Sequence, residues 1–414
     1  MALFSAWGHF LFQTGIMGLV FTYICSNEMT GNFEMNEERR GKYAGWLKRG
    51  ILAEGVLVLA LGMLVMGKQE RDAAERTISN RILSIEDDYI KWVDFTVSYE
   101  ALCRAYEWDV KTHETEYSID WVELLAYTAA KTGGEFDRDA LKTLDKAAEK
   151  LAEGETVMEE LTEDLKYYPY YREAYDAAIG GLVGEYWEEN PEYGGGSVLS
   201  GESADGDQRD GPAGEQTGRY TRQYGLKGYF PLARGFDYTH YDDFGAGRSY
   251  GYARKHLGHD MMGLVGTPIM AIESGVVTAL GWNQYGGWRI GISSFDGKRY
   301  YYYAHLRQNY PYAEGLQEGS VVTAGDVIGY MGHTGYSTTE NVNNIKIVHL
   351  HWGLQLIFDE SQKEGNNEIW IDVYPLTRFL AKHTQAAVKV EGTKEWVRTV
   401  DIVDPEVEEY EAGQ

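Results

Sequence analysis

The sequence predicts a multidomain chain with N-terminal transmembrane helices, an all-α middle domain and a C-terminal domain of mainly antiparallel β-structure. Three observations predict this class. Two long apolar runs lie near the N-terminus, apolar residues then recur at helical spacing, and aromatic-rich segments separated by glycines fill the C-terminal part. We expect a membrane anchor of one or two helices over 1–68, the helical domain over 69–187 and a flexible linker over 188–220. The β domain should span 221–382, and an acidic tail 383–414.

The composition of the 414 residues excludes several classes of protein. The formal net charge is −26, which gives the chain no general attraction for nucleic acid. Two cysteines are too few for a disulfide scaffold or for a zinc site built from thiolates. Any metal ion would therefore have to be held by histidine and carboxylate side chains.

The two apolar runs, 2–25 and 50–67, each approach the ~20 residues that a membrane helix needs. The segment between them is basic, with Arg39, Arg40, Lys42, Lys48 and Arg49. Such a loop stays in the cytoplasm, so we expect a protein of the cell membrane whose C-terminal part lies on the extracytoplasmic side. The alternative for each run is a buried helix of a soluble protein.

The middle of the chain reads as a helical domain. It faintly resembles the lysozyme-like domains of bacterial wall hydrolases, but Lys131 and Thr132 stand where such a helix would end in the catalytic glutamate. We therefore expect a spacer or binding module, open to a partner in an envelope complex. The Gly- and Ser-rich segment 188–220 predicts a flexible linker, and the acidic tail after 382 is expected to be poorly ordered.

Six of the ten histidines lie between His256 and His351, in three short motifs. In the motif HLHWGLQL, apolar residues alternate with His349 and His351, which is the period of a strand. Both imidazoles therefore project from one face of the strand. This arrangement can place a metal ligand beside a catalytic base.

The motif HLGHD places His256 four residues before Asp260, with Gly258 between them. This spacing puts the two side chains on one face of either a strand or a helix. A histidine and a carboxylate from one segment, with a histidine from another, make a three-ligand zinc site that stays open to water. The third motif, YYYYAHL, carries His305 in an aromatic run typical of a central strand; the alternative for His305 is a hydrogen-bonded core histidine.

These three motifs resemble those of the lysostaphin-type (LytM-like) zinc endopeptidases, whose pattern is HxGxD, then YAH, then HLHxxL. The resemblance runs over about a third of the chain, 228–380. It implies a core sheet with an open groove, and Zn²⁺ as cofactor. It also implies roles for individual residues: the metal ligands would be His256, Asp260 and His351, and the catalytic residues would be His305 and His349.

The resemblance implies a membrane-anchored zinc endopeptidase that hydrolyses peptide bonds in peptidoglycan stems or cross-bridges. The alternative is a catalytically silent relative that acts as a scaffold or activator of another wall hydrolase. Two other histidines, His259 and His333, are expected to stay outside the metal site, although His333 could touch substrate. Four aromatic residues near the motifs are candidates for the groove wall, with sheet packing favoured for most of them: Tyr285, Trp288, Tyr330 and Trp352.

Overall fold

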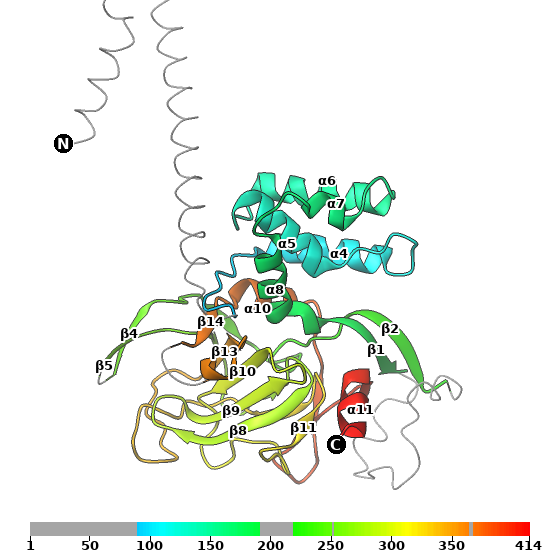
Figure 1. The fold of residues 1–414 in the computed structure, drawn as a ribbon. Coiled ribbons are helices and arrows are strands. Elements are labelled where there is room, and N and C mark those ends of the chain that lie inside the picture. The colour runs from blue at the N-terminus through cyan, green and yellow to red at the C-terminus, as the bar shows by residue number, and fades with distance from the viewer. Residues whose placement is uncertain (1–88, 191–217, 251, 364–366) are drawn as a thin grey trace, which may run out of the picture. The chain divides into compact units, whose positions relative to one another are not determined.

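The computed structural model describes residues 89–190, 218–250, 252–363 and 367–414 (Figure 1). Within these ranges no helix has both the length and the apolar character needed to cross a membrane. The predicted fold class is therefore wrong in its transmembrane helices, because the described helices reach at most 15 residues where about 20 are needed. The two apolar runs, 2–25 and 50–67, lie outside the described residues.

The middle of the chain is helical from 99 to 182, but the predicted all-α range 69–187 also contains the start of strand β1 (Val183–Glu189). Its segments are α4 (Tyr99–Thr112), α5 (Trp121–Thr132), α6 (Arg138–Ala152), α7 (Met158–Thr162), α8 (Tyr168–Ile179) and the 3-10 turn η1 (Gly180–Leu182). Three of them begin at a capping side chain that accepts hydrogen bonds from the first turn: Ser98, Asp120 and Asp137. These caps fix where each helix starts.

The helices join the rest of the chain through a buried ion pair. The Arg299 guanidinium bonds to the Glu273 carboxylate at 2.8 and 3.0 Å, and its Nη1 donates to the carbonyl oxygens of Asp176 and Ala177 at the end of α8. Gly181 packs against this pair so closely that a Cβ there would lie 1.8 Å from a Glu273 oxygen. One continuous hydrophobic core then runs from the helices into the β-structure.

The largest sheet is antiparallel, with strand order β11-β8-β9-β10-β13-β6-β3 and β14 paired to β13. Its strands are β3 (Thr239–Tyr241), β6 (His259–Met262), β8 (Gly275–Asn283), β9 (Gly287–Ser294), β10 (Arg299–Ala304), β11 (Val321–Val322), β13 (His349–Leu356) and β14 (Ile369–Ile371). The predicted antiparallel β-structure of this part is confirmed. The three motifs reach this sheet at β6, β10 and β13.

Smaller antiparallel pairs surround the sheet. They are β4 (Gly247–Tyr250) with β5 (Tyr252–Lys255), β7 (Pro268–Met270) with β12 (Val327–Tyr330), and β15 (Ala387–Lys389) with β16 (Trp396–Arg398). A three-stranded sheet is formed by β1 (Val183–Glu189), β2 (Tyr220–Leu226) and β17 (Ile402–Val403). The predicted linker lies mostly outside the described residues, and its two ends run into β1 and β2.

The C-terminal tail is not poorly ordered, so that prediction is wrong. It forms β15, β16, β17 and the helix α11 (Pro405–Ala412). Its acidic residues find partners far away in the sequence: Lys227 Nζ lies 3.3 Å from Asp404 Oδ1 and 2.7 Å from Glu406 Oε1, and the Ser274 hydroxyl donates to Asp404 at 2.6 Å. An acidic composition suggests a solvated tail only when such partners are absent.

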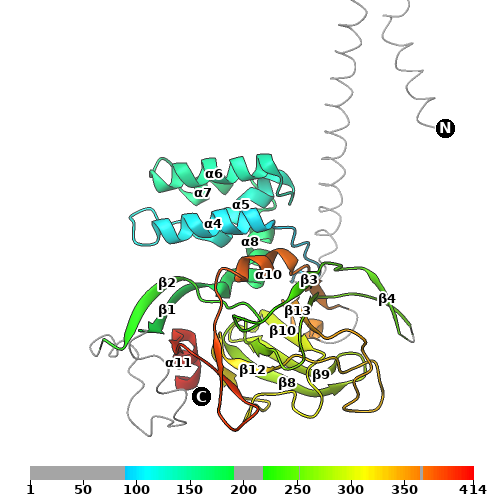
Figure 2. The ribbon, with the colours of Figure 1, turned by 180° about the vertical axis from the view of Figure 1, so that it is seen from behind.

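The remaining elements are the 3-10 turn η3 (Glu360–Gln362) and the helix α10 (Tyr374–Leu380). In Figures 1 and 2 α10 lies between the helices of the middle region and the strands. Phe379 of α10 stacks on Trp121 of α5 with ring centroids 5.6 Å apart, and the Trp352 indole of β13 donates to the Thr377 hydroxyl. Helix α10 therefore packs against the back of the strand that carries His349 and His351.

Candidate metal centre and active-site groove

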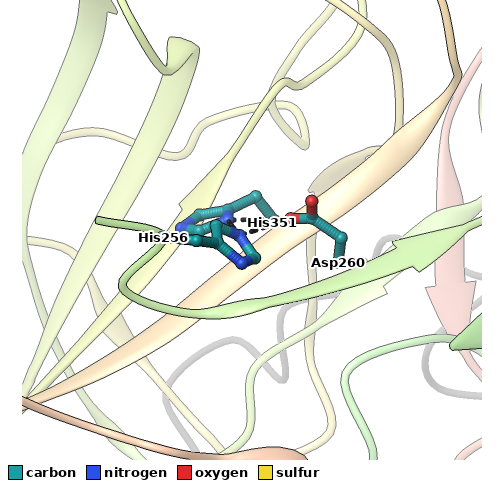
Figure 3. A group of neighbouring side chains, drawn as sticks. All are labelled: His256, Asp260 and His351. Atoms are coloured by element: carbon teal, nitrogen blue, oxygen red, sulfur yellow. Dashed lines mark hydrogen bonds and ion pairs between the residues drawn. The ribbon is translucent and has the colours of Figure 1, made fainter. Parts of the chain in front are cut away.

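His256, Asp260 and His351 converge on one point (Figure 3). His256 Nε2 lies 3.0 Å from Asp260 Oδ1 and 2.9 Å from His351 Nδ1, and these last two atoms lie 2.9 Å apart. His256 and Asp260 are buried, and His351 is nearly so. The three predicted metal ligands are thus brought together as a compact triangle of donor atoms.

The register of two strands creates this triangle. Strands β6 and β13 pair so that His351 lies directly opposite Asp260, which puts both side chains on one face of the sheet. His256 reaches the same point because the chain before β6 passes close to β13. At Gly258 a Cβ would lie 2.5 Å from the Trp352 carbonyl oxygen and 2.6 Å from the His351 ring, so only glycine permits this approach.

The chemistry of the triangle fits a divalent cation. Burial alone would raise the pKa of Asp260, but hydrogen bonds from His256 and His351 hold it well below its usual range, so the carboxylate is ionised. Burial lowers the pKa of His351, against the pull of Asp260. Protons on both imidazole nitrogens would point at each other across 2.9 Å, whereas one cation satisfies all three atoms. Two histidines and one carboxylate are a ligand set that zinc uses.

His305 and His349 lie beside the triangle. Their ring centroids are 4.7 Å apart, and His349 Nε2 is 3.8 Å from Asp260 Oδ1. In each ring Nδ1 lies 2.9 Å from a backbone carbonyl oxygen, that of Thr334 for His305 and that of Ile347 for His349. A carbonyl oxygen can only accept, so Nδ1 carries the proton and Nε2 is left as an acceptor.

The backbone holds His305 in an unusual conformation. Its φ of 63° lies in the left-handed region, which costs a non-glycine residue about 1–2 kcal/mol. Burial, and then the nearby imidazoles of His349 and His351, lower the pKa of His305 well below its ordinary value. The ring is therefore neutral, with an unprotonated Nε2. Strained residues of this kind cluster at functional sites.

The comparison with known proteins agrees with this geometry. Residues 254–364 match the model described as "Peptidase family M23", a span that contains all five of these side chains. This segment is a peptidase family M23 domain. The resemblance to lysostaphin-type enzymes inferred from the motifs is confirmed for the C-terminal part of the chain.

Two curated relatives and one solved structure are similar to part of the chain. The chain is 36% identical over 149 residues to the L-Ala–D-Glu endopeptidase of Bacillus subtilis (strain 168), covering 36% of this chain and 42% of that relative. It is 37% identical over 94 residues to lysostaphin of Staphylococcus simulans, covering 22% of this chain and 18% of lysostaphin. The crystallised catalytic domain of that lysostaphin aligns at 30% identity and a TM-score of 0.27, over 34% of this chain and 92% of the domain. The chain thus spans less than half the length of these curated relatives.

Two residues that sequence reasoning missed contact the candidate metal ligands of the M23 domain. Asp243 Oδ1 lies 2.7 Å from His256 Nδ1, at ion-pair distance but off the line of a straight hydrogen bond. Arg248 Nη2 lies 2.8 Å from Asp243 Oδ2 and 3.0 Å from Asp260 Oδ2. These contacts orient both ligands. Both residues lie in the segment before the first motif, and no spacing in the sequence marks them.

The two other histidines near the motifs, His259 and His333, lie outside the triangle. His259 points to the opposite face of β6, where its Nε2 lies 2.8 Å from His240 Nδ1 and its ring packs on Tyr374. His333 Nδ1 donates to the carbonyl oxygen of Ile345 at 2.7 Å. Neither ring belongs to the triangle of His256, Asp260 and His351.

A groove of about 1110 Å³ opens over the triangle. Of the four candidate aromatic residues only Tyr285 lines it. Tyr330 and Trp352 are completely buried, and Trp288 donates its indole N–H to Asn341. Tyr302 and Trp370 line the groove instead, and sequence reasoning did not single them out.

Proposed function

We propose that the M23 domain hydrolyses peptide bonds in the stems or cross-bridges of peptidoglycan, with Zn²⁺ held by His256, Asp260 and His351. One observation carries the proposal: three donor atoms within about 3 Å of one another lie in a groove beside two further imidazoles. The names of the relatives, an L-Ala–D-Glu endopeptidase and lysostaphin, support an endopeptidase role.

When bound, zinc supplies Lewis-acid activation of the scissile carbonyl and of the attacking water. Two imidazoles supply the proton transfers and the stabilisation of the oxyanion. His349 accepts the proton of the water at Nε2, while its Nδ1–H bond to the Ile347 carbonyl holds the ring in place. The same nitrogen then returns the proton to the leaving amine.

His305 acts beside it. Because its Nδ1 donates to Thr334, neutral His305 cannot donate through Nε2. It can therefore stabilise the developing oxyanion only after taking up a proton, and the second O–H of the attacking water supplies that proton. Its depressed pKa makes that protonated form short-lived and a ready donor.

The substrate fixes where this reaction would occur. Peptidoglycan lies outside the cell membrane, so we place the M23 domain on the extracytoplasmic side. Cell fractionation followed by protease accessibility of intact cells would test that location. A domain protected from protease in intact cells would contradict it.

The test of the function uses the purified full-length chain and its His351→Ala variant. We expect about one zinc per chain in the parent protein, and release of new amino termini from peptidoglycan, identified by mass spectrometry of the fragments. The variant should lose both zinc and hydrolysis. A parent protein that binds zinc but releases no peptide from peptidoglycan of any cross-bridge type would contradict the proposal and favour the scaffold role.

A further inference from the structure

The charge of the groove is opposite to that of the chain. The whole sequence has 64 acidic and 38 basic side chains. The groove is lined by two carboxylates, Asp260 and Glu368, and by six cationic side chains: Arg248, Arg254, Lys255, Arg289, Lys346 and Lys363. A local reversal of this size attracts anionic groups to the groove while the rest of the surface repels them.

Most of these cations lack a protein counter-ion. Arg248 pairs with Asp243 and Asp260, and Lys363 pairs with Glu360 at 2.8 Å. Within the described ranges, no carboxylate lies at ion-pair distance from the other four, which are Arg254, Lys255, Arg289 and Lys346. In addition, the Nε of Arg289 is buried without a hydrogen-bond partner among the described residues.

Two tyrosine side chains position the guanidinium of Arg254. Its guanidinium centre lies 4.9 Å from the rings of both Tyr285 and Tyr336, and its Nη2 donates to the Tyr336 hydroxyl at 2.6 Å. It also lies directly opposite Arg248 in the β4–β5 hairpin. Arg248 is already paired with two carboxylates, so Arg254 is the member of this cross-strand pair that has no carboxylate partner in the described part of the chain and can bind one from a ligand.

Three of the cations without a carboxylate partner in the described structure lie close in sequence to the site histidines. Arg254 and Lys255 directly precede His256, and Lys346 lies three residues before His349. Arg254 and Lys255 are thus two and one peptide units from His256, and the side chains of all three cations line the same groove as His256, His349 and His351. A carboxylate on a residue next to the scissile bond would reach them.

We propose that the groove selects acidic peptides, in which residues next to the scissile bond carry free carboxylates, over neutral glycine cross-bridges, and that Arg254 and Lys346 set this specificity. The inference rests on the proposed function and names the substrate class of the same site. Each partly exposed ion pair is expected to change kcat/KM by about two- to fivefold, and a stacked arginine by up to about tenfold.

The test compares two peptides of equal size: a stem peptide that contains γ-linked D-glutamate with its α-carboxylate free, and the same peptide with that carboxylate amidated. The full-length chain should cleave the free acid about tenfold more efficiently, and 0.5 M salt should shrink the preference. The double variant Arg254→Gln/Lys346→Gln should lose the preference but still cleave the amide. Equal kcat/KM for acid and amide in the parent protein would overturn the proposal.

Two further variants serve as controls for the loss of a positive charge and for the loss of the stacked guanidinium. Lys363→Gln removes a groove cation that Glu360 already neutralises, so the preference should survive. Arg254→Lys keeps the charge but not the stacked planar fork, so part of the preference should remain. If no peptide is cleaved, the proposed function fails, and titration calorimetry of the two peptides still decides the inference: tighter binding of the acid supports it, and equal binding refutes it.

Discussion

Strand β6 carries two buried histidine clusters on its two faces, and they differ in chemistry although they arise from neighbouring residues. On one face Asp260 meets His256 and His351 at the floor of a groove. On the other face His259 meets His240 at 2.8 Å, packed against Tyr374. The first cluster contains a carboxylate and opens into the groove, whereas the second consists of two imidazoles packed on a tyrosine ring.

The carboxylate explains the difference. Burial, and then His240, lower the pKa of His259 to about 3, and burial lowers that of His240 too. The pair is therefore neutral, and one imidazole donates to the other. In the first cluster the ionised Asp260 provides the negative charge that a cation needs. The comparison teaches that, on this strand, only the face with a carboxylate offers a cation a negative charge as well as imidazole ligands.

The largest expected effect comes from breaking the first cluster and sparing the second. His351→Ala and Asp260→Ala should abolish zinc binding and hydrolysis, because a three-ligand site cannot lose a donor and keep its affinity. The matched control is His259→Gln, which should keep the full zinc content and activity. Its free energy of unfolding should fall by about 1–3 kcal/mol, which lowers its melting temperature. Zinc content and thermal melts of the three variants check this. Loss of zinc in His259→Gln would contradict the separation of the two faces.

The imidazoles beside the metal site should behave differently from its ligands. His305→Ala and His349→Ala should retain zinc but lower kcat by about 10²–10⁴-fold, the usual range for removing an acid–base group. Metal analysis together with steady-state kinetics would separate the two roles. A variant that lost zinc in proportion to activity would have to be counted among the ligands.

A substitution of Asp243 tests whether a residue that contacts the first cluster from outside contributes to its zinc affinity. Asp243→Asn keeps the shape but removes the charge 2.7 Å from His256 Nδ1, so zinc affinity should fall by about 10–100-fold. Competition with a chromophoric chelator measures this. Asp242→Asn, one residue earlier, is the matched control and should leave the affinity unchanged.

The smallest expected effect concerns His383, a half-buried histidine outside both clusters. His383 donates to the Gly228 carbonyl, and burial lowers its pKa to about 4. The unfolded chain takes up this proton below pH 6.5 and the folded chain does not, so stability is complete above pH 6.5 and is lost as the pH falls toward 4. Between pH 6.5 and 5.5 the loss should be about 1 kcal/mol. Denaturant titrations should show a flatter pH dependence in His383→Gln, and an unchanged slope would exclude His383 as the cause.

Much of the site could be predicted from local patterns. The alternation in HLHWGLQL indicated the strand that became β13, and the HLGHD spacing indicated that His256 and Asp260 would lie together. Asp243 and Arg248 were missed because they belong to no motif, and their contacts depend on how the β4–β5 hairpin folds over the site. The tail was misjudged because Lys227, its partner, lies 177 residues before Asp404.

The sequence by itself determined that His349 and His351 share one face of a strand and that His256 and Asp260 lie together, because strand period and motif spacing act over a few residues and need no distant partner. The roles of these residues and of His305 came from the resemblance to lysostaphin-type enzymes and stay predictions. Only the tertiary structure decided the charge of the groove, the two faces of β6 and the order of the tail. These properties depend on which side chains, far apart in the sequence, come within a few ångströms of one another. The number of charges in a chain does not reveal which of them are neutralised.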